Sequence, residues 1–157
     1  MTTEGLANRC LTNVKLKNFI TQAEVITITI GSNDLLRVGT AILQGEKINM
    51  FVALSNMERN LDLIGSQIRR INPKALVKVG TIYNPLSVGQ YYQYSGTAQA
   101  LIVQINKSIV HWAERYRFNV VRIDKAFQGR EHLVLGVDHL HPNLMGHQII
   151  ATEFARL

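Results

Sequence analysis

Short apolar runs alternate with long amphipathic stretches along the chain. The runs are residues 25–30, 75–82 and 119–124, and each is rich in valine and isoleucine. Between them, apolar residues recur at steps of three and four, which is the spacing of one helical face. Strands that alternate with long helices predict a parallel sheet joined by right-handed crossovers. The pattern therefore predicts a single α/β domain over residues 1–157.

The helical stretches have recognisable starts and ends. Helices are predicted at residues 3–22, 46–71, 95–117 and 143–156. Thr2 or Thr3 can cap the first helix, and Pro73 stops the second. Residues 35–44 give no clear pattern. The stretch between the third apolar run and the last helix is predicted to be a loop.

The first apolar run leads into a polar turn. Residues 25–30 are apolar or threonine at every position, which is typical of a central strand with both faces covered. The run ends at Gly31-Ser32-Asn33-Asp34. In open α/β sheets, ligands bind at the carboxyl ends of the strands, so this turn is a candidate part of a site.

Composition and charge narrow the classes of protein. Hydrophobic residues make up 46% and charged residues 18%, as in a folded domain. The net charge is +6, but lysines and arginines are scattered, so no nucleic-acid partner is predicted. No apolar run is long enough for a membrane span, and no signal peptide is visible. The single Cys10 forms no internal disulfide, so the sequence as it stands is compatible with the cytoplasm.

An acid–imidazole pair lies before the last predicted helix. Asp138 and His141 are three residues apart, followed by Pro142, so a tight turn can bring their side chains into hydrogen-bonding distance. A carboxylate that holds an imidazole in one tautomer is two-thirds of a nucleophile-activating triad. The alternative is a structural hydrogen bond that caps the last helix. The pair alone does not decide between these interpretations.

The third member of such a triad is not evident. Ser32 lies at a variable position in its turn and is a weak candidate, while Cys10 on an apolar helical stripe favours a core position. His139 and His147 beside the Asp–His pair could suggest a metal cluster, but no second group of ligands is apparent. We therefore predict neither a metal nor a cofactor.

Two segments together resemble the SGNH (GDSL-type) hydrolases. Residues 23–36, which contain Gly31-Ser32-Asn33-Asp34, look like the third sequence block of that family. Residues 137–147, which contain Asp138-x-x-His141-Pro142, look like its fifth block. The resemblance implies a flavodoxin-like three-layer α/β/α fold and membership among esterases, lipases and acyl hydrolases. It implies a small ester or a lipid-like molecule as the substrate.

The resemblance also assigns roles to residues. His141 would be the general base and Asp138 the carboxylate that orients it. Asn33 would donate its amide to the oxyanion hole, and Gly31 would let the turn pass close to the substrate. These residue types suit acyl transfer, which needs a base near neutral pH and neutral donors aimed at the developing oxyanion.

The sequence departs from the family pattern at its start. The nucleophilic serine of the family lies in a Gly-Asp-Ser block, and a second block gives an oxyanion-hole glycine; this sequence contains neither. We therefore expect the N-terminal strands of the family fold to be missing, together with any secretion signal before them. On this expectation the chain lacks its nucleophile and is inactive alone. The alternative is a catalytically dead hydrolase fold that acts as a binding or assembly module.

The missing strands would leave an open sheet edge. In the family order 2-1-3-4-5, the first strand pairs directly with the strand that corresponds to residues 25–30. Without that strand, residues 25–30 become an apolar edge, which folded proteins tend to cover. We therefore expect a homo-oligomer in which residues 25–30 of two copies pair across a two-fold axis.

Overall fold

Three parallel strands form the sheet of this protein. The computed structural model describes residues 1–156. Strands β1 (Val25–Thr29), β2 (Leu76–Gly80) and β3 (Asn119–Val121) lie in the order β1-β2-β3, with Thr27 beside Lys78 and Val79 beside Val120. All neighbouring pairs are parallel, so the predicted parallel α/β architecture is confirmed.

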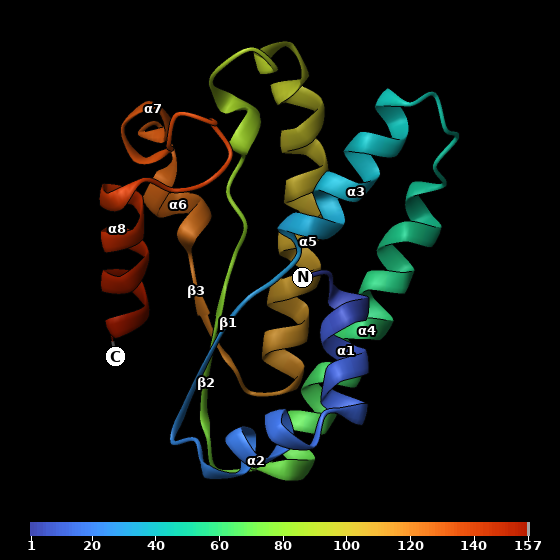
Figure 1. Ribbon diagram of the computed structural model, residues 1–157, viewed down its shortest axis with the longest axis vertical. Coiled ribbons are helices and arrows are strands. Elements are labelled where there is room, and N and C mark those ends of the chain that lie inside the picture. Colours follow the sequence, from blue (N-terminus) through green and yellow to red (C-terminus); the bar gives the residue numbers. More distant parts are fainter. Residues whose placement is uncertain (157) are drawn as a thin grey trace.

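Helices cover both faces of the sheet, with α8 on one side and α1, α4 and α5 on the other (Figure 1). The helices are α1 (Thr3–Thr12), α2 (Val14–Gln22), α3 (Ser32–Leu43), α4 (Met50–Ile71), α5 (Ser95–Arg115), α6 (Ile123–Phe127), α7 (Glu131–Val134) and α8 (Leu144–Ala155). Short 3-10 turns, η1 (Pro85–Ser87) and η2 (Tyr92–Tyr94), follow β2. Within residues 1–156, no helix combines the length and apolarity needed to cross a bilayer.

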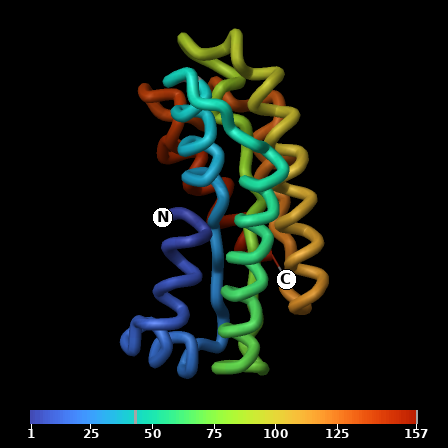
Figure 2. Tube along the Cα trace, turned by 90° about the vertical axis from the view of Figure 1, so that its right-hand side faces the viewer, coloured from blue at the N-terminus to red at the C-terminus, as the bar shows by residue number. Residues whose placement is uncertain are grey.

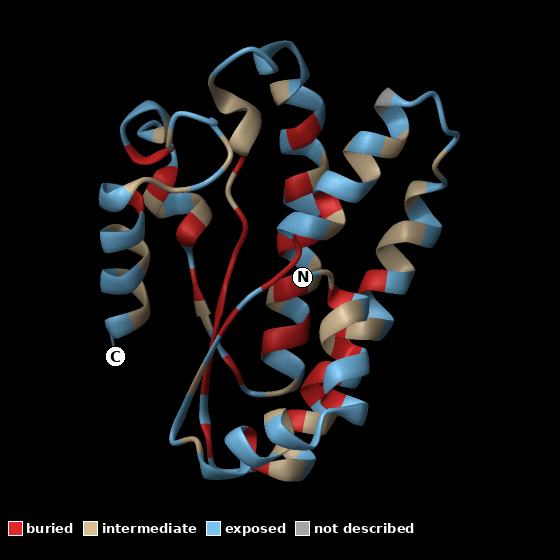
Figure 3. Ribbon diagram, viewed as in Figure 1, coloured by how far each residue is buried: buried red, intermediate tan, exposed pale blue. Residues whose placement is uncertain are grey.

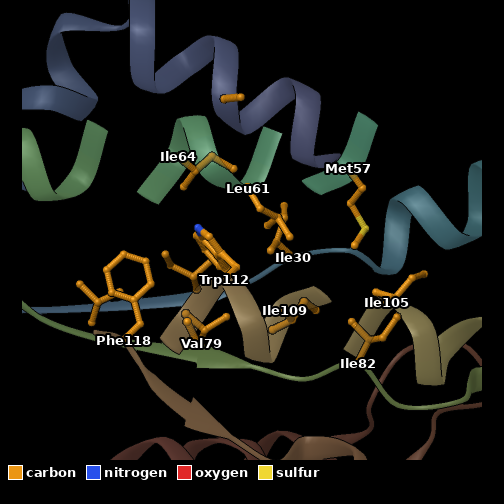
Figure 4. Packing of buried hydrophobic residues seen from close by; sticks show 14 of the residues in the cluster. Ile30, Met57, Leu61, Ile64, Val79, Ile82, Ile105, Ile109, Trp112 and Phe118 are labelled. Carbon is orange, nitrogen blue, oxygen red and sulfur yellow. The ribbon is translucent and has the colours of Figure 1, made fainter. Parts of the chain in front are cut away.

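The main core lies between the sheet and the long helices α4 and α5, which run alongside each other (Figure 2). Trp112 of α5 packs between Ile64 of α4 and Val79 of β2 (Figure 4). A smaller apolar cluster around the fully buried Phe127 packs α6 and α7 against α8. The apolar stripes that predict α4 and α5 therefore face the core, as their spacing requires.

Strand β1 is an edge strand and is covered on one face only. Ile28 and Ile30 are buried in the main core, whereas Val25, Thr27 and Thr29 on the other face are exposed (Figure 3). The prediction that both faces are covered is therefore wrong. The prediction that this strand is a sheet edge is confirmed, because β2 is its neighbour in the sheet and no strand lies on its other side within the described residues.

The predicted helix over residues 3–22 is two helices. Thr2 caps α1 by accepting a hydrogen bond from the Gly5 N–H, as predicted for that position. Asn13 then takes an extended conformation (φ −88°, ψ 104°), and its side chain accepts the Leu16 N–H to cap α2. The side-chain amide of Asn13 thus competes with helix continuation, which an apolar stripe does not reveal.

Other boundaries also differ from the prediction. Of the unclear residues 35–44, all but Gln44 belong to helix α3, which begins after Gly31. Helix α4 begins after its Asn49 cap rather than at residue 46. Strand β3 ends at Val121, and the stretch predicted as a loop contains the short helices α6 and α7. These helices are too short for a 3.6-residue period to be visible in the sequence.

Candidate active site

A cavity of about 450 Å³ opens at the carboxyl ends of β1 and β2. Its walls come from the turn after β1, the segment after β2, the loop before α8 and the first turns of α8. Its polar or chemically active side chains include Ser32, Asn33, Thr81, Tyr83, His141 and His147. The structure therefore brings the two motifs, more than a hundred residues apart in the sequence, to one cavity at the edge where parallel sheets bind ligands.

The predicted Asp–His pair is formed. Nδ1 of His141 lies 2.7 Å from Oδ2 of Asp138. The other carboxylate oxygen, Oδ1, accepts the backbone N–H groups of Leu140 and His141, each at 3.0 Å. Both side chains are largely exposed, 77% for His141 and 47% for Asp138. The carboxylate thus fixes the imidazole from one side. The opposite ring nitrogen, Nε2, makes no hydrogen bond to another of the described residues.

These hydrogen bonds hold the pKa of Asp138 well below its usual range. The side-chain bond to His141 is the largest cause, followed by the two backbone N–H donors. A carboxyl whose pKa is lowered on folding contributes stability that is present above its unfolded pKa and is lost as the pH falls through its folded pKa. At neutral pH Asp138 is therefore a carboxylate that accepts the Nδ1 proton of His141.

The loop that carries this pair is closed upon itself. Leu135 and Pro142 form an antiparallel bridge, and the Gly136 N–H donates to the His141 carbonyl at 2.7 Å. Asn143 then caps α8 by accepting the Gly146 N–H. His139 lies at the tip of this turn with a left-handed φ of 55°. The loop therefore presents His141 just before α8 begins.

The turn after β1 is shaped by Gly31. Its φ is 108°, a left-handed backbone conformation in which a side chain is unfavourable. Asn33 donates its amide to the Met1 carbonyl at 3.2 Å, inside the same cavity. Asp34 accepts both the backbone N–H and the hydroxyl of the fully buried Thr3. Asp34 thus binds the start of α1 rather than capping the segment that follows it.

No nucleophile is paired with the imidazole. Within residues 1–156, no hydroxyl or thiol hydrogen-bonds to His141. Ser32 is exposed and lines the cavity, while the Thr81 hydroxyl is engaged by Asp124 at 2.7 Å. Cys10 is buried, as predicted, and burial raises the pKa of its thiol.

The histidines do not form a metal centre with their neighbours. Among the residues described, no three His, Cys, Asp or Glu side chains converge on one point. His147 lines the cavity from α8, whereas His139 packs against Gly89.

Tyr83 is a site residue that sequence reasoning missed. Its hydroxyl donates a hydrogen bond to the Leu140 carbonyl at 2.8 Å. In the sequence, Leu140 lies between Asp138 and His141. Tyr83 and Leu140 are 57 positions apart, so no local pattern links them. The one signal in the sequence is that Tyr83 follows the second apolar run closely, at the carboxyl end of a strand.

A parallel α/β fold with an Asp–His pair and an asparagine amide at one carboxyl-edge cavity defines an SGNH-like hydrolase fold. The chain belongs to the GDSL-like lipase/acylhydrolase family, whose family model matches residues 2–149. The resemblance seen in the sequence is therefore confirmed.

Individual similar proteins are hydrolases of esters. The spore germination lipase LipC of Bacillus licheniformis is 28% identical over 140 residues, which cover 85% of this chain and 63% of LipC. This chain thus spans less than two-thirds of that relative.

Solved structures share the fold. The lipase Lip_vut3 from a goat rumen metagenome has a TM-score of 0.81 at 23% identity, over 98% of this chain and 72% of that one. A catalytic mutant of an acetylxylan esterase from Geobacillus stearothermophilus has a TM-score of 0.69 at 18% identity, over 98% and 66%. An extracellular lipase from Streptomyces rimosus has a TM-score of 0.68 at 18% identity, over 94% and 76%. At these identities the likeness establishes the α/β fold.

Proposed function

We propose that this chain contributes the general base, its orienting carboxylate and an oxyanion donor to the active site of a serine ester hydrolase. His141 is the general base, Asp138 orients it, and Asn33 donates to the oxyanion. The observation that carries the proposal is the 2.7 Å contact between His141 and Asp138 on the same cavity as Asn33. The lipases and the acetylxylan esterase among the similar proteins support small esters or lipid-like esters as the substrate.

Each residue has a defined task in this chemistry. Nε2 of His141 takes the proton of a serine hydroxyl as the serine oxygen attacks the ester carbonyl. The carbonyl oxygen becomes an oxyanion that accepts the Asn33 amide, and one such donor is typically worth about 3 kcal/mol. The imidazolium then gives its proton to the departing alkoxide, and Asp138 stabilises the imidazolium meanwhile. A water molecule releases the acyl group by the same steps in reverse.

The Gly31 and Asn33 turn is suited to its task. The amide of Asn33 already donates to a carbonyl oxygen inside the cavity, which supports its role as a donor to substrate oxygen. Gly31 is itself buried, and its left-handed φ of 108° lets the chain turn sharply between β1 and Asn33.

The nucleophilic serine, in this proposal, is not one of the hydroxyl groups of the described residues. The observation that supports this assignment is that no hydroxyl in those residues hydrogen-bonds to His141. The second candidate function is a binding or assembly module that keeps the hydrolase fold without turnover. Because no hydroxyl in residues 1–156 hydrogen-bonds to His141, this second function is the one favoured for the chain by itself.

A serine-directed fluorophosphonate probe tests where the nucleophile lies. Such probes modify serines that a neighbouring base activates. We expect no adduct on residues 1–157 by peptide mass spectrometry, because no hydroxyl reaches His141. Ser32→Ala serves as the comparison protein. An adduct on Ser32 that disappears in His141→Ala would instead make Ser32 the nucleophile and contradict this part of the proposal.

We propose further that two copies of this chain pair through β1. Two features support this proposal: β1 is an edge strand of the sheet within the described residues, and its Val25 is exposed. Open apolar edges favour the addition of another strand. A lysine in place of Thr27 would put a charge on that exposed strand and is expected to shift a dimer toward monomer in light scattering. Thr21→Lys, on the exposed part of α2, should leave the mass unchanged. A wild-type chain that is monomeric throughout the micromolar range would contradict the proposal.

A further inference from the structure

The segment that follows β2 lies directly against the loop of the Asp–His pair. The Tyr83 hydroxyl donates to the Leu140 carbonyl at 2.8 Å, and Leu140 lies between the two members of the pair. We infer that Tyr83 is a positioning residue that holds Asp138 and His141 in their hydrogen-bonded geometry. This inference rests on the proposed function, in which His141 is the base.

Tyr83 is itself firmly held. Its ring packs against the Phe127 ring with centroids 4.8 Å apart, and Phe127 is fully buried. Burial, and secondarily the charge of Asp138, raise the pKa of the Tyr83 phenol to about 12. The phenol therefore stays protonated at neutral pH and can act as a hydrogen-bond donor to Leu140 throughout the working range.

A second contact joins the same two segments. Gly89 has a left-handed φ of 83°, and an added Cβ would lie 2.6 Å from the His139 ring. His139 is the left-handed residue at the tip of the loop. The segment from Tyr83 to Gly89 thus supports the loop at two points, one polar and one steric.

The loop has little else to hold it in place. Val137 is fully exposed, and Asp138, His139 and His141 are also exposed. The backbone bonds of the turn join residues 134–143 to one another. Among the residues described, the Tyr83 bond is the hydrogen bond that ties residues 136–141 to a distant segment. Without it, the Leu140 carbonyl is free to turn, and the loop relaxes between Asp138 and His141.

The tautomer of His141 reports this positioning. A carboxylate at Nδ1 selects the Nδ1–H tautomer, whereas a free imidazole samples both. In protein labelled with ¹⁵N-histidine, at a pH where the ring is neutral, the two nitrogen shifts of His141 give the Nδ1–H fraction. Tyr83→Phe removes one oxygen atom, and we expect it to lower that fraction about twofold, because Asp138 and His141 drift apart.

Tyr116→Phe is the matched control. The Tyr116 hydroxyl also donates to a backbone carbonyl, that of Asp62, at 3.0 Å and far from the cavity. Both variants lose a comparable hydrogen bond, so a merely structural role would affect them alike. We expect Tyr116→Phe to leave the His141 tautomer unchanged.

An unchanged Nδ1–H fraction in folded Tyr83→Phe would overturn the inference. If that variant does not fold, Gly89→Ala makes the same test at an exposed position: its Cβ should displace His139 and lower the fraction as well. An unchanged fraction in Gly89→Ala would then overturn it. The readout needs no ester turnover, so it remains decisive even where the proposed hydrolase function fails.

Discussion

Gly146→Ala is expected to lower the free energy of unfolding by about 2 kcal/mol, although alanine is the better helix former. Gly146 is buried in the first turn of α8. An added Cβ would lie 2.3 Å from the Val134 carbonyl oxygen and 2.8 Å from the Pro142 side chain. That carbonyl accepts the Asn143 N–H and cannot rotate away, so α8 must shift. The shift also disturbs the loop that carries His141.

Gly39→Ala is the matched control for this variant. Gly39 lies in helix α3, and an added Cβ there meets no atom within 4 Å. It should stabilise the protein by about 0.5–1 kcal/mol through helix propensity alone. Denaturant unfolding followed by circular dichroism measures both changes. Equal denaturation midpoints for the two variants would show that the close packing around Gly146 does not contribute to the free energy of unfolding.

Much of the fold is predictable from local pattern. Three β-branched runs and long amphipathic stretches give the parallel sheet and the helices α4, α5 and α8, because burial on one face imposes the period. The break at Asn13 and the short helices α6 and α7 are not predictable in this way. They depend on side-chain capping and on tertiary packing, which leave no repeat in the sequence. The half-covered state of β1 depends on what lies beside it in space.

In the candidate site, too, local contacts are predictable from the sequence and contacts between distant segments are not. Asp138 and His141 are three residues apart, so their pairing is a local property that the sequence discloses. Contacts between distant segments are different: Tyr83 meets Leu140, and Asn33 meets Met1. These depend on where the β2 segment and the first residues settle after folding. The type of a residue alone does not predict such a contact.

His141→Ala is the second change with a large expected effect. An imidazole held by a carboxylate can activate water, or attack an activated ester itself, even where no serine is present. The wild-type chain should therefore cleave p-nitrophenyl acetate slowly but above the buffer rate. Removal of the imidazole should reduce the protein-dependent rate about a hundredfold. The fold should persist, because the His141 side chain is exposed.

The comparison of His141→Ala with His132→Ala tests the central claim most directly. Both histidines are exposed, but only His141 hydrogen-bonds to Asp138 within the described residues. The measurement is the initial rate of p-nitrophenyl acetate cleavage by equal amounts of folded protein. We predict that His132→Ala retains most of the wild-type rate and that His141→Ala falls to background. Equal rates for wild type and His141→Ala would contradict the assignment of His141 as the base.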